Sequence, residues 1–171
     1  MVTALPHDIS LVVNGEHVRE RVDARTTLVD FLRDTLELTG SHVGCEHGVC
    51  GACTVRVNGT VVRGCLMLAV QCDGMRVETI EGVADTGEIA DLEQAFIVRN
   101  ALQCGFCTPG MLLTAQALLS SASMPSRADI RAHLAGNYCR CTGYQAIVDA
   151  IEAVAATRAS IKAAAGEDAS K

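Results

Sequence analysis

The sequence predicts an α+β chain in two parts, a small α+β unit over residues 1–82 and a helical unit over residues 83–160. Two observations predict this division. Apolar residues alternate around Asn-Gly turns in the first part, and the hydrophobic period changes from 2 to 3.6 beyond Gly82. A third observation is that cysteines are grouped into short motifs in both parts. A chain of 171 residues has room for two such units.

The first unit is predicted to combine strands with one helix. Its two hairpins each flank an Asn-Gly turn, with residues 9–13 and 18–22 around Asn14-Gly15, and residues 54–57 and 61–62 around Asn58-Gly59. A helix capped by Thr26 or Thr27 ends at Gly40 and carries apolar residues on one face, at Leu28, Phe31, Leu32 and Leu36. Residues 76–80 form a late strand that closes the unit.

The second unit is predicted to contain four helices joined by short links, which suggests a bundle. The helices are recognised by Leu92 and Phe96, by the cap Thr108-Pro109 ahead of residues 110–119, by a capping box at Ser126, and by the apolar positions from Tyr144 to Ala155. Residues 161–171, rich in Ala with mixed charge, are expected to form a flexible tail.

Composition excludes several function classes. The formal charge is −6 and aromatic residues make up 3 %, which disfavours nucleic-acid binding. The longest apolar run, Cys65–Val70, is far shorter than the roughly 20 residues that span a bilayer. No secretory signal is visible over Met1–Ser10, so we expect a cytoplasmic protein.

The nine cysteines are the informative residues. An odd number without a signal peptide fits a disulfide framework poorly, and scattered buried thiols would not be grouped as these are. Metal ligation therefore explains them best. The cysteines lie at positions 45, 50, 53, 65, 72, 104, 107, 139 and 141.

The first group has the spacing C-x4-C-x2-C, followed by a fourth cysteine, which is typical of a plant-type [2Fe–2S] site. Its members are Cys45, Cys50, Cys53 and Cys65. Gly44, Gly48 and Gly51 allow the loop to wrap closely and to aim backbone N–H groups at sulfur. Structural zinc is the rival, but zinc sites usually pair their ligands as two short units.

The second group is Cys104-Gly105-Phe106-Cys107 followed by Cys139-Arg140-Cys141. On spacing alone these four cysteines fit zinc and an iron–sulfur cluster equally well, and a lone C-x2-C also fits a redox dithiol. A plant-type site in the same chain favours a second cluster. Each pair precedes a predicted helix, whose N-terminal N–H groups suit an anionic cluster.

The remaining candidates have ordinary interpretations. Cys72 is expected to be a buried or half-buried bystander, and His42 and His47 to be solvated or hydrogen-bonded instead of binding metal as in Rieske centres. Tyr138 and Tyr144 are expected to pack around the second group. Arg140 either raises the potential of a cluster by its charge or forms an ordinary salt bridge.

Three segments together resemble a known family: residues 44–55, Gln103–Gly110 and Asn137–Tyr144. With the sequence over residues 8–158, they resemble the iron–sulfur subunit of the molybdenum hydroxylases, the family of xanthine dehydrogenase and aldehyde oxidoreductase. One departure is Glu46, where many xanthine-type members have Gly; it leaves the ligand set untouched.

The resemblance implies a ferredoxin-like β-grasp domain over residues 1–82 and a four-helix domain over residues 83–160, each with one [2Fe–2S] cluster. It implies that the outer cluster, toward a flavin, is held by Cys45, Cys50, Cys53 and Cys65. It implies that the inner cluster, toward a molybdenum–pterin cofactor, is held by Cys104, Cys107, Cys139 and Cys141. Gln103 would lie beside the pterin, and Cys141 would also contact its amino group.

The resemblance also implies partners. Members of this length are typically one chain of a three-chain bacterial enzyme, with a large molybdopterin-binding chain and a medium FAD-binding chain, and two such trimers usually associate. The chain would then be an electron-transfer subunit with no catalytic residue of its own, because substrate is oxidised in another chain. The alternatives are a free-standing soluble ferredoxin and a β-grasp adaptor that binds zinc.

Overall fold

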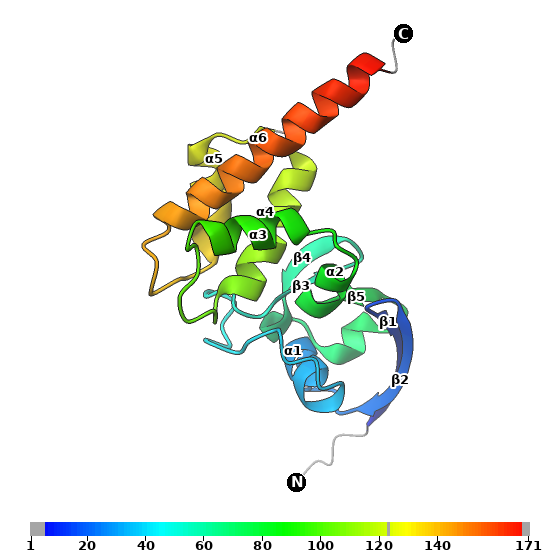
Figure 1. The fold of residues 1–171 in the computed structure, drawn as a ribbon. Helices are drawn as coiled ribbons and strands as arrows, with labels where there is room; N and C mark the ends of the chain where they lie inside the picture. Colours follow the sequence, from blue (N-terminus) through cyan, green and yellow to red (C-terminus); the bar gives the residue numbers. More distant parts are fainter. Residues whose placement is uncertain (1–5, 123, 169–171) are drawn as a thin grey trace.

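The computed structural model describes residues 6–122 and 124–168 (Figure 1). A five-stranded sheet with two short helices beside it forms one half, and the longer helices that follow in the chain form most of the other. The strands are β1 (His7–Val13), β2 (Glu16–Val22), β3 (Thr54–Val57), β4 (Thr60–Arg63) and β5 (Arg76–Glu78). The α-helices are α1 (Leu28–Asp30), α2 (Ile80–Asp85), α3 (Ala90–Val98), α4 (Thr108–Ser121), α5 (Arg127–His133) and α6 (Gln145–Asp168).

The sheet has the strand order β2-β1-β5-β3-β4. The pairs β1–β2, β3–β4 and β3–β5 are antiparallel, whereas β1 and β5 are parallel. Both predicted hairpins are confirmed, since Asn14-Gly15 and Asn58-Gly59 have positive φ at each residue, as a type I′ turn requires.

The helix that covers the sheet is shorter than predicted. Thr27 caps it by accepting a hydrogen bond from the N–H of Asp30, and after α1 the chain continues as a π-helical segment, η1 (Phe31–Thr35). The helix does not reach Gly40, because Glu37 adopts a left-handed conformation with φ of 58° and turns the chain away.

Two further boundaries differ from the sequence prediction. β5 ends at Glu78 and Ile80 begins α2, a short helix whose one buried residue, Val83, gives no periodic signal. Cys107 caps α4, so Thr108 is its first helical residue instead of its cap. The capping box at Ser126 is confirmed, with Asp129 returning the hydrogen bond.

Helix α6 is the longest element and extends past the other helices (Figure 1). It begins after Tyr144 and continues through residues 161–168, which are predicted from the sequence to belong to a flexible tail. Alanine is the best helix former, which accounts for the continuation. The rest of that tail, residues 169–171, lies outside the described residues. No helix within residues 6–122 and 124–168 is long and apolar enough to cross a membrane.

The buried apolar residues form two separate cores. One lies between the sheet and α1–η1, with Leu11, Phe31 and Val55 among its members. The other lies among α2–α6 and includes Phe96, Met111 and residues of α6. The cysteine-bearing loops run along one side of the molecule, at the left in Figure 1, where the two halves meet.

Candidate iron–sulfur centres

The first cysteine loop lies between η1 and β3 and folds around the thiol of Cys45. The backbone N–H groups of His47 and Cys50 both donate to Cys45 Sγ, at 3.4 Å each. These hydrogen bonds, that of His47 first, lower the pKa of Cys45 to about 6. The positive φ angles of Glu46, Gly48 and Gly51 produce the turns that aim these donors inward.

Two glycines of this loop lie at positions where a side chain would not fit. A Cβ on Gly44 would lie 3.1 Å from Cys50 Sγ, and a Cβ on Gly48 would lie 2.2 Å from Leu66 Cδ1. Leu66 belongs to η2 (Gly64–Leu66), the 3₁₀ turn that carries Cys65. The loop therefore closes onto the segment bearing the fourth predicted ligand.

Cys53 and Cys65 are joined to this site through the backbone. The N–H of Gly64 donates to the carbonyl of Cys53 at 3.0 Å, which places the two cysteine-bearing segments side by side. Cys53 is 2 % exposed, and burial raises the pKa of its thiol to about 11. The four thiols thus span environments from an exposed loop to the edge of the core.

The second set gathers from two segments. Cys104 and Cys141 are both exposed, and their sulfurs lie 3.6 Å apart. Burial, together with the neighbouring Cys139, raises the pKa of Cys107 to about 12. Each segment lies directly ahead of a helix, α4 or α6. The structure therefore brings together the cysteines that precede the two helices.

Thr142 is a neighbour of Cys139 that sequence reasoning missed. Its hydroxyl lies 3.1 Å from Cys139 Sγ and is placed to donate to it. Burial acts to raise the pKa of Cys139, but this hydrogen bond and the backbone N–H groups of Cys141 and Thr142 outweigh it and leave the pKa below its usual value. The position of Thr142, three residues after Cys139, could have indicated this contact, because the hydroxyl of a Ser or Thr in a loop often forms a hydrogen bond with a group a few residues earlier in the chain.

Tyr144 has a more specific role than the packing predicted from sequence. Its hydroxyl accepts the N–H of Cys139 at 2.7 Å and donates to the carbonyl of Asn137 at 3.1 Å. Its φ of 67° is left-handed, an uncommon conformation for an aromatic residue. Tyr144 therefore fixes the loop that precedes α6, and nothing in the sequence pattern signals this.

Backbone and side-chain contacts join the two cysteine-bearing loops. The N–H of Tyr138 donates to the carbonyl of Cys50 at 2.8 Å, which links the first loop to the residue next to Cys139. His42 stacks on Phe106 with ring centroids 4.6 Å apart, and His42 Nδ1 lies 2.8 Å from the Phe106 carbonyl. His42 therefore makes hydrogen-bonding and stacking contacts, and it bridges the two loops.

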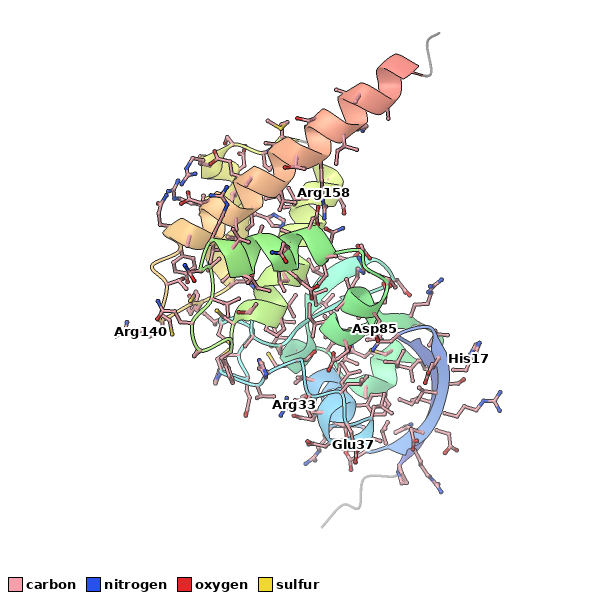
Figure 2. All side chains as sticks on the ribbon, viewed as in Figure 1. His17, Arg33, Glu37, Asp85, Arg140 and Arg158 are labelled. Carbon is pink, nitrogen blue, oxygen red and sulfur yellow. The ribbon has the colours of Figure 1, made fainter. Side chains whose placement is uncertain are left out.

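The other singled-out residues occupy distinct places. His47 bonds to the carbonyl of Cys45 through Nδ1. Cys72 is fully buried in the sheet-side core, apart from both sets, with a pKa raised to about 11 by burial. Arg140 is exposed and projects outward at the edge of the molecule (Figure 2), and it makes no salt bridge within the described residues. Gln103 is exposed, and its Nε2 donates to the carbonyl of Cys141 at 3.1 Å.

The residues present fit iron–sulfur clusters. All nine cysteines are free thiols, and thiolates are the ligands such clusters take. Gly44 lets the backbone approach Cys50 Sγ closely, and backbone N–H groups point at Cys45 Sγ as they would at cluster sulfur. Among the described residues, no three His, Cys, Asp or Glu side chains converge on one position as they would around a single metal ion.

Comparisons with known proteins agree with this chemistry. A family model described as "2Fe-2S iron-sulfur cluster binding domain" matches residues 11–79, and one described as "[2Fe-2S] binding domain" matches residues 79–152. The chain is therefore an iron–sulfur protein with two [2Fe–2S]-binding regions.

Individual relatives show more closely which class of iron–sulfur protein the chain is similar to. The chain is 53 % identical over 154 residues to the caffeine dehydrogenase subunit gamma of Pseudomonas sp. (strain CBB1), covering 88 % of this chain and 92 % of that one. It is 49 % identical over 154 residues to the nicotine 6-hydroxylase small subunit of Paenarthrobacter nicotinovorans, covering 88 % and 93 %. The crystal structure of quinoline 2-oxidoreductase from Pseudomonas putida 86 matches with a TM-score of 0.84 and 45 % identity, over 90 % of this chain and 96 % of that chain.

This chain belongs to the iron–sulfur subunits of the molybdenum hydroxylase family, which includes xanthine dehydrogenase and aldehyde oxidoreductase. It is a subunit of an oxidoreductase and serves electron transfer, and substrate is oxidised outside this chain.

Proposed function

We propose that this chain carries electrons from a molybdopterin centre in a large partner chain, through its two clusters, to FAD in a medium partner chain. The inner cluster is held by Cys104, Cys107, Cys139 and Cys141, and the outer cluster by Cys45, Cys50, Cys53 and Cys65. When bound, the clusters supply one-electron carriers, and the chain's residues hold them and tune their potentials.

The hydrogen bond between Tyr138 N–H and the Cys50 carbonyl is the observation that carries this proposal. Cys50 belongs to one ligand set, and Tyr138 adjoins Cys139 of the other. One path between the two sets therefore consists of this 2.8 Å hydrogen bond and a few covalent bonds. A direct link of this kind suits a chain whose task is to pass electrons between two centres.

Exposed residues around each set support two partner faces. Gln103, Cys104 and Cys141 are exposed beside the half-exposed apolar side chains of Phe106 and Tyr138, and this face would meet the large chain near the pterin. Beside the outer set, Val49 of the loop is 49 % and Leu66 of η2 is 64 % exposed, and this second face would meet the FAD-binding chain. The assembly would be a heterotrimer, and two trimers would associate.

The finer fold assignment is part of the same proposal. The sheet half over residues 1–82 would be a ferredoxin-like β-grasp domain, and the helices over residues 83–160 would form a four-helix bundle domain. The two separate apolar cores support a division into two domains.

We also propose that the complex hydroxylates nitrogen heterocycles. The support is that the relatives described above are named for caffeine, nicotine and quinoline, which all contain such rings. Reduction of a dye by the purified complex, with these compounds compared with simple aldehydes, tests the substrate class. Activity with aldehydes alone would contradict it.

The electron route is tested by expressing the chain with its neighbouring large and medium chains and purifying the complex. We expect about four irons and four acid-labile sulfides per copy of this chain, and two distinct [2Fe–2S] signals in electron paramagnetic resonance spectra of the reduced complex. Zinc without acid-labile sulfide, a single cluster signal, or purification of the chain without partners would overturn the proposal.

A further inference from the structure

A buried asparagine lies between the two cysteine loops. Asn137 is 1 % exposed. Its Oδ1 accepts from Thr114 Oγ1 at 3.1 Å and from Arg63 Nη2 at 3.3 Å, and its Nδ2 donates to the Gly51 carbonyl at 3.4 Å. A guanidinium can only donate and a carbonyl can only accept, so these partners fix the orientation of the amide.

The Asn137 side chain connects the two predicted ligand sets. Gly51 lies between Cys50 and Cys53 of the outer set, and Asn137 lies two residues ahead of Cys139 of the inner set. The bond from Asn137 Nδ2 to the Gly51 carbonyl therefore crosses from one loop to the other, next to the hydrogen bond that joins Tyr138 to Cys50.

Glycines permit a close approach of the backbone at this crossing. A Cβ on Gly51 would lie 2.4 Å from the carbonyl oxygen of Gly136, and a Cβ on Gly110 would lie 2.2 Å from the carbonyl oxygen of Gly51. Gly51 also has a φ of +74°. The outer loop is thus pressed directly against the start of α4 and the segment ahead of Cys139.

Arg63 forms a second connection between the same parts. It lies two residues ahead of Cys65, at the end of β4. Its Nη2 donates to the Gly136 carbonyl at 2.8 Å as well as to Asn137, and its Nη1 donates to the hydroxyl of Thr54, the residue after Cys53. One guanidinium therefore ties the outer-loop side of the sheet to the inner loop.

We infer that Asn137 and Arg63 are positioning residues that fix the outer and inner cysteine sets relative to each other, an inference that rests on the proposed function. Tyr138 directly follows Asn137, so restraining the Asn137 side chain also restrains the N–H that bonds to Cys50. The two residues ligate nothing themselves. They hold the short link between the clusters in place.

The inference is tested with the intact three-chain complex carrying Asn137→Ala, which removes all three side-chain bonds. The first measurement is hydrogen exchange of the Tyr138 amide, followed in a peptide by mass spectrometry. The second is the magnetic coupling between the two reduced clusters in electron paramagnetic resonance spectra. We expect exchange to be faster by at least about tenfold, the effect of losing roughly one net hydrogen bond, and an altered coupling with both cluster signals retained.

A second variant and a control separate positioning from general destabilisation. Arg63→Lys keeps the charge but loses the planar fork, so it should change exchange and coupling in the same direction, by less. Asn14→Gly removes a comparable pair of hydrogen bonds, between Asn14 and Thr79 at the far end of β1, and glycine tolerates the positive φ there. This control should lower stability while leaving the exchange of Tyr138 and the coupling unchanged.

Each outcome decides between the alternatives. Wild-type exchange and coupling in both variants would overturn the inference. Loss of a cluster in both variants, with both clusters kept in Asn14→Gly, would also overturn it, because the residues would then act in cluster assembly. Absence of a second cluster signal in the unmutated complex would instead contradict the proposed function.

Discussion

The two cysteine sites are built in different ways. Three of the four cysteines of the proposed outer site lie within nine residues of one loop, and the hydrogen bond from Gly64 to the Cys53 carbonyl holds the segment of the fourth beside them. The proposed inner site takes one pair of cysteines from the segment ahead of α4 and the other from the segment ahead of α6, with 31 residues between the two pairs. The outer site is therefore shaped mainly by local backbone conformation, and the inner site by the packing of helices.

The two sites also differ in burial. Cys53 is buried and the other outer cysteines are partly buried, whereas Cys104 and Cys141 of the inner site are exposed. A bound cluster at the inner site would be open on one side, and a partner surface would cover it. The difference supports our assignment of the inner site to the large-chain interface.

Removal of one cysteine gives the largest expected effect and tests the assignment of the two sets. Cys50→Ser should abolish the outer cluster and Cys107→Ser the inner one, because each cluster needs four thiolates. Iron content should fall by about half in each variant, and a different resonance signal should vanish in each.

Cys72→Ser is the matched control for this pair. The Cys72 thiol is buried in the sheet-side core, so both cluster signals should remain. Loss of a cluster in Cys72→Ser, or loss of the same signal in Cys50→Ser and Cys107→Ser, would contradict the division of the ligands.

Alanine at a loop glycine compares how tightly the two loops are packed. At Gly51 the added Cβ meets the Gly136 carbonyl at 2.4 Å in a left-handed conformation, so we expect a loss of about 3 kcal/mol in the free energy of unfolding. Gly105 of the inner loop has a φ of +82° but open space around it, so Gly105→Ala should lose only about 1 kcal/mol. Thermal unfolding of the two variants measures the difference; equal losses would contradict it.

The difference between local conformation and contacts that are distant in the sequence explains which features could be predicted from the sequence. The Asn-Gly hairpins, the cysteine spacing and the loop glycines are local signals, and the structure confirms the hairpins. The contacts of Asn137 with Gly51 and of Tyr138 with Cys50 join residues 86 and 88 positions apart, and no periodicity or spacing records them. The π-helical end of the first helix was missed for the same reason, since it depends on how Glu37 turns the chain after the helix packs on the sheet.

A polar network away from the cysteines predicts a pH effect of intermediate size. Arg56 on β3 bonds to Glu78 and Glu88, Glu88 also accepts from Gln116 on α4, and Gln116 accepts from Arg158 on α6. The network thus joins the sheet to the helices, and Arg158 marks its α6 end in Figure 2. The hydrogen bond from Arg56 holds the pKa of Glu88 below its usual range.

A carboxylate with a lowered pKa stabilises the fold at pH values above its ordinary pKa of about 4.3. This stabilisation is lost as the pH falls through the lowered pKa. The free energy of unfolding of Glu88→Gln should therefore be lower by about 1 kcal/mol at pH 7, and it should fall less than that of the wild type as the pH is lowered. Glu152→Gln, which removes a more exposed partner of Arg127 within the helical half, is the control and should change little. Urea unfolding at pH 7 and at about pH 3, below the ordinary pKa of a glutamate, measures both variants, and an unchanged acid dependence in Glu88→Gln would contradict the prediction.

The smallest predicted effect concerns the sulfur hydrogen bonds of the two sites. Both donors to Cys45 Sγ are backbone N–H groups, whereas Cys139 Sγ is placed to receive the side-chain hydroxyl of Thr142. A hydrogen bond to a ligand sulfur stabilises the reduced, more negative cluster. Thr142→Val should therefore lower the potential of the inner cluster by on the order of 40 mV, the equivalent of about 1 kcal/mol for one electron.

Redox titration followed by electron paramagnetic resonance measures this shift for each cluster separately. The outer cluster should keep its potential in Thr142→Val, and Thr142→Ser, which retains the hydroxyl, should behave as wild type at both clusters. An equal shift at both clusters would mean that Thr142 acts on the fold as a whole and not on Cys139. A shift confined to the inner cluster would show that a single side chain, the Thr142 hydroxyl, tunes this site.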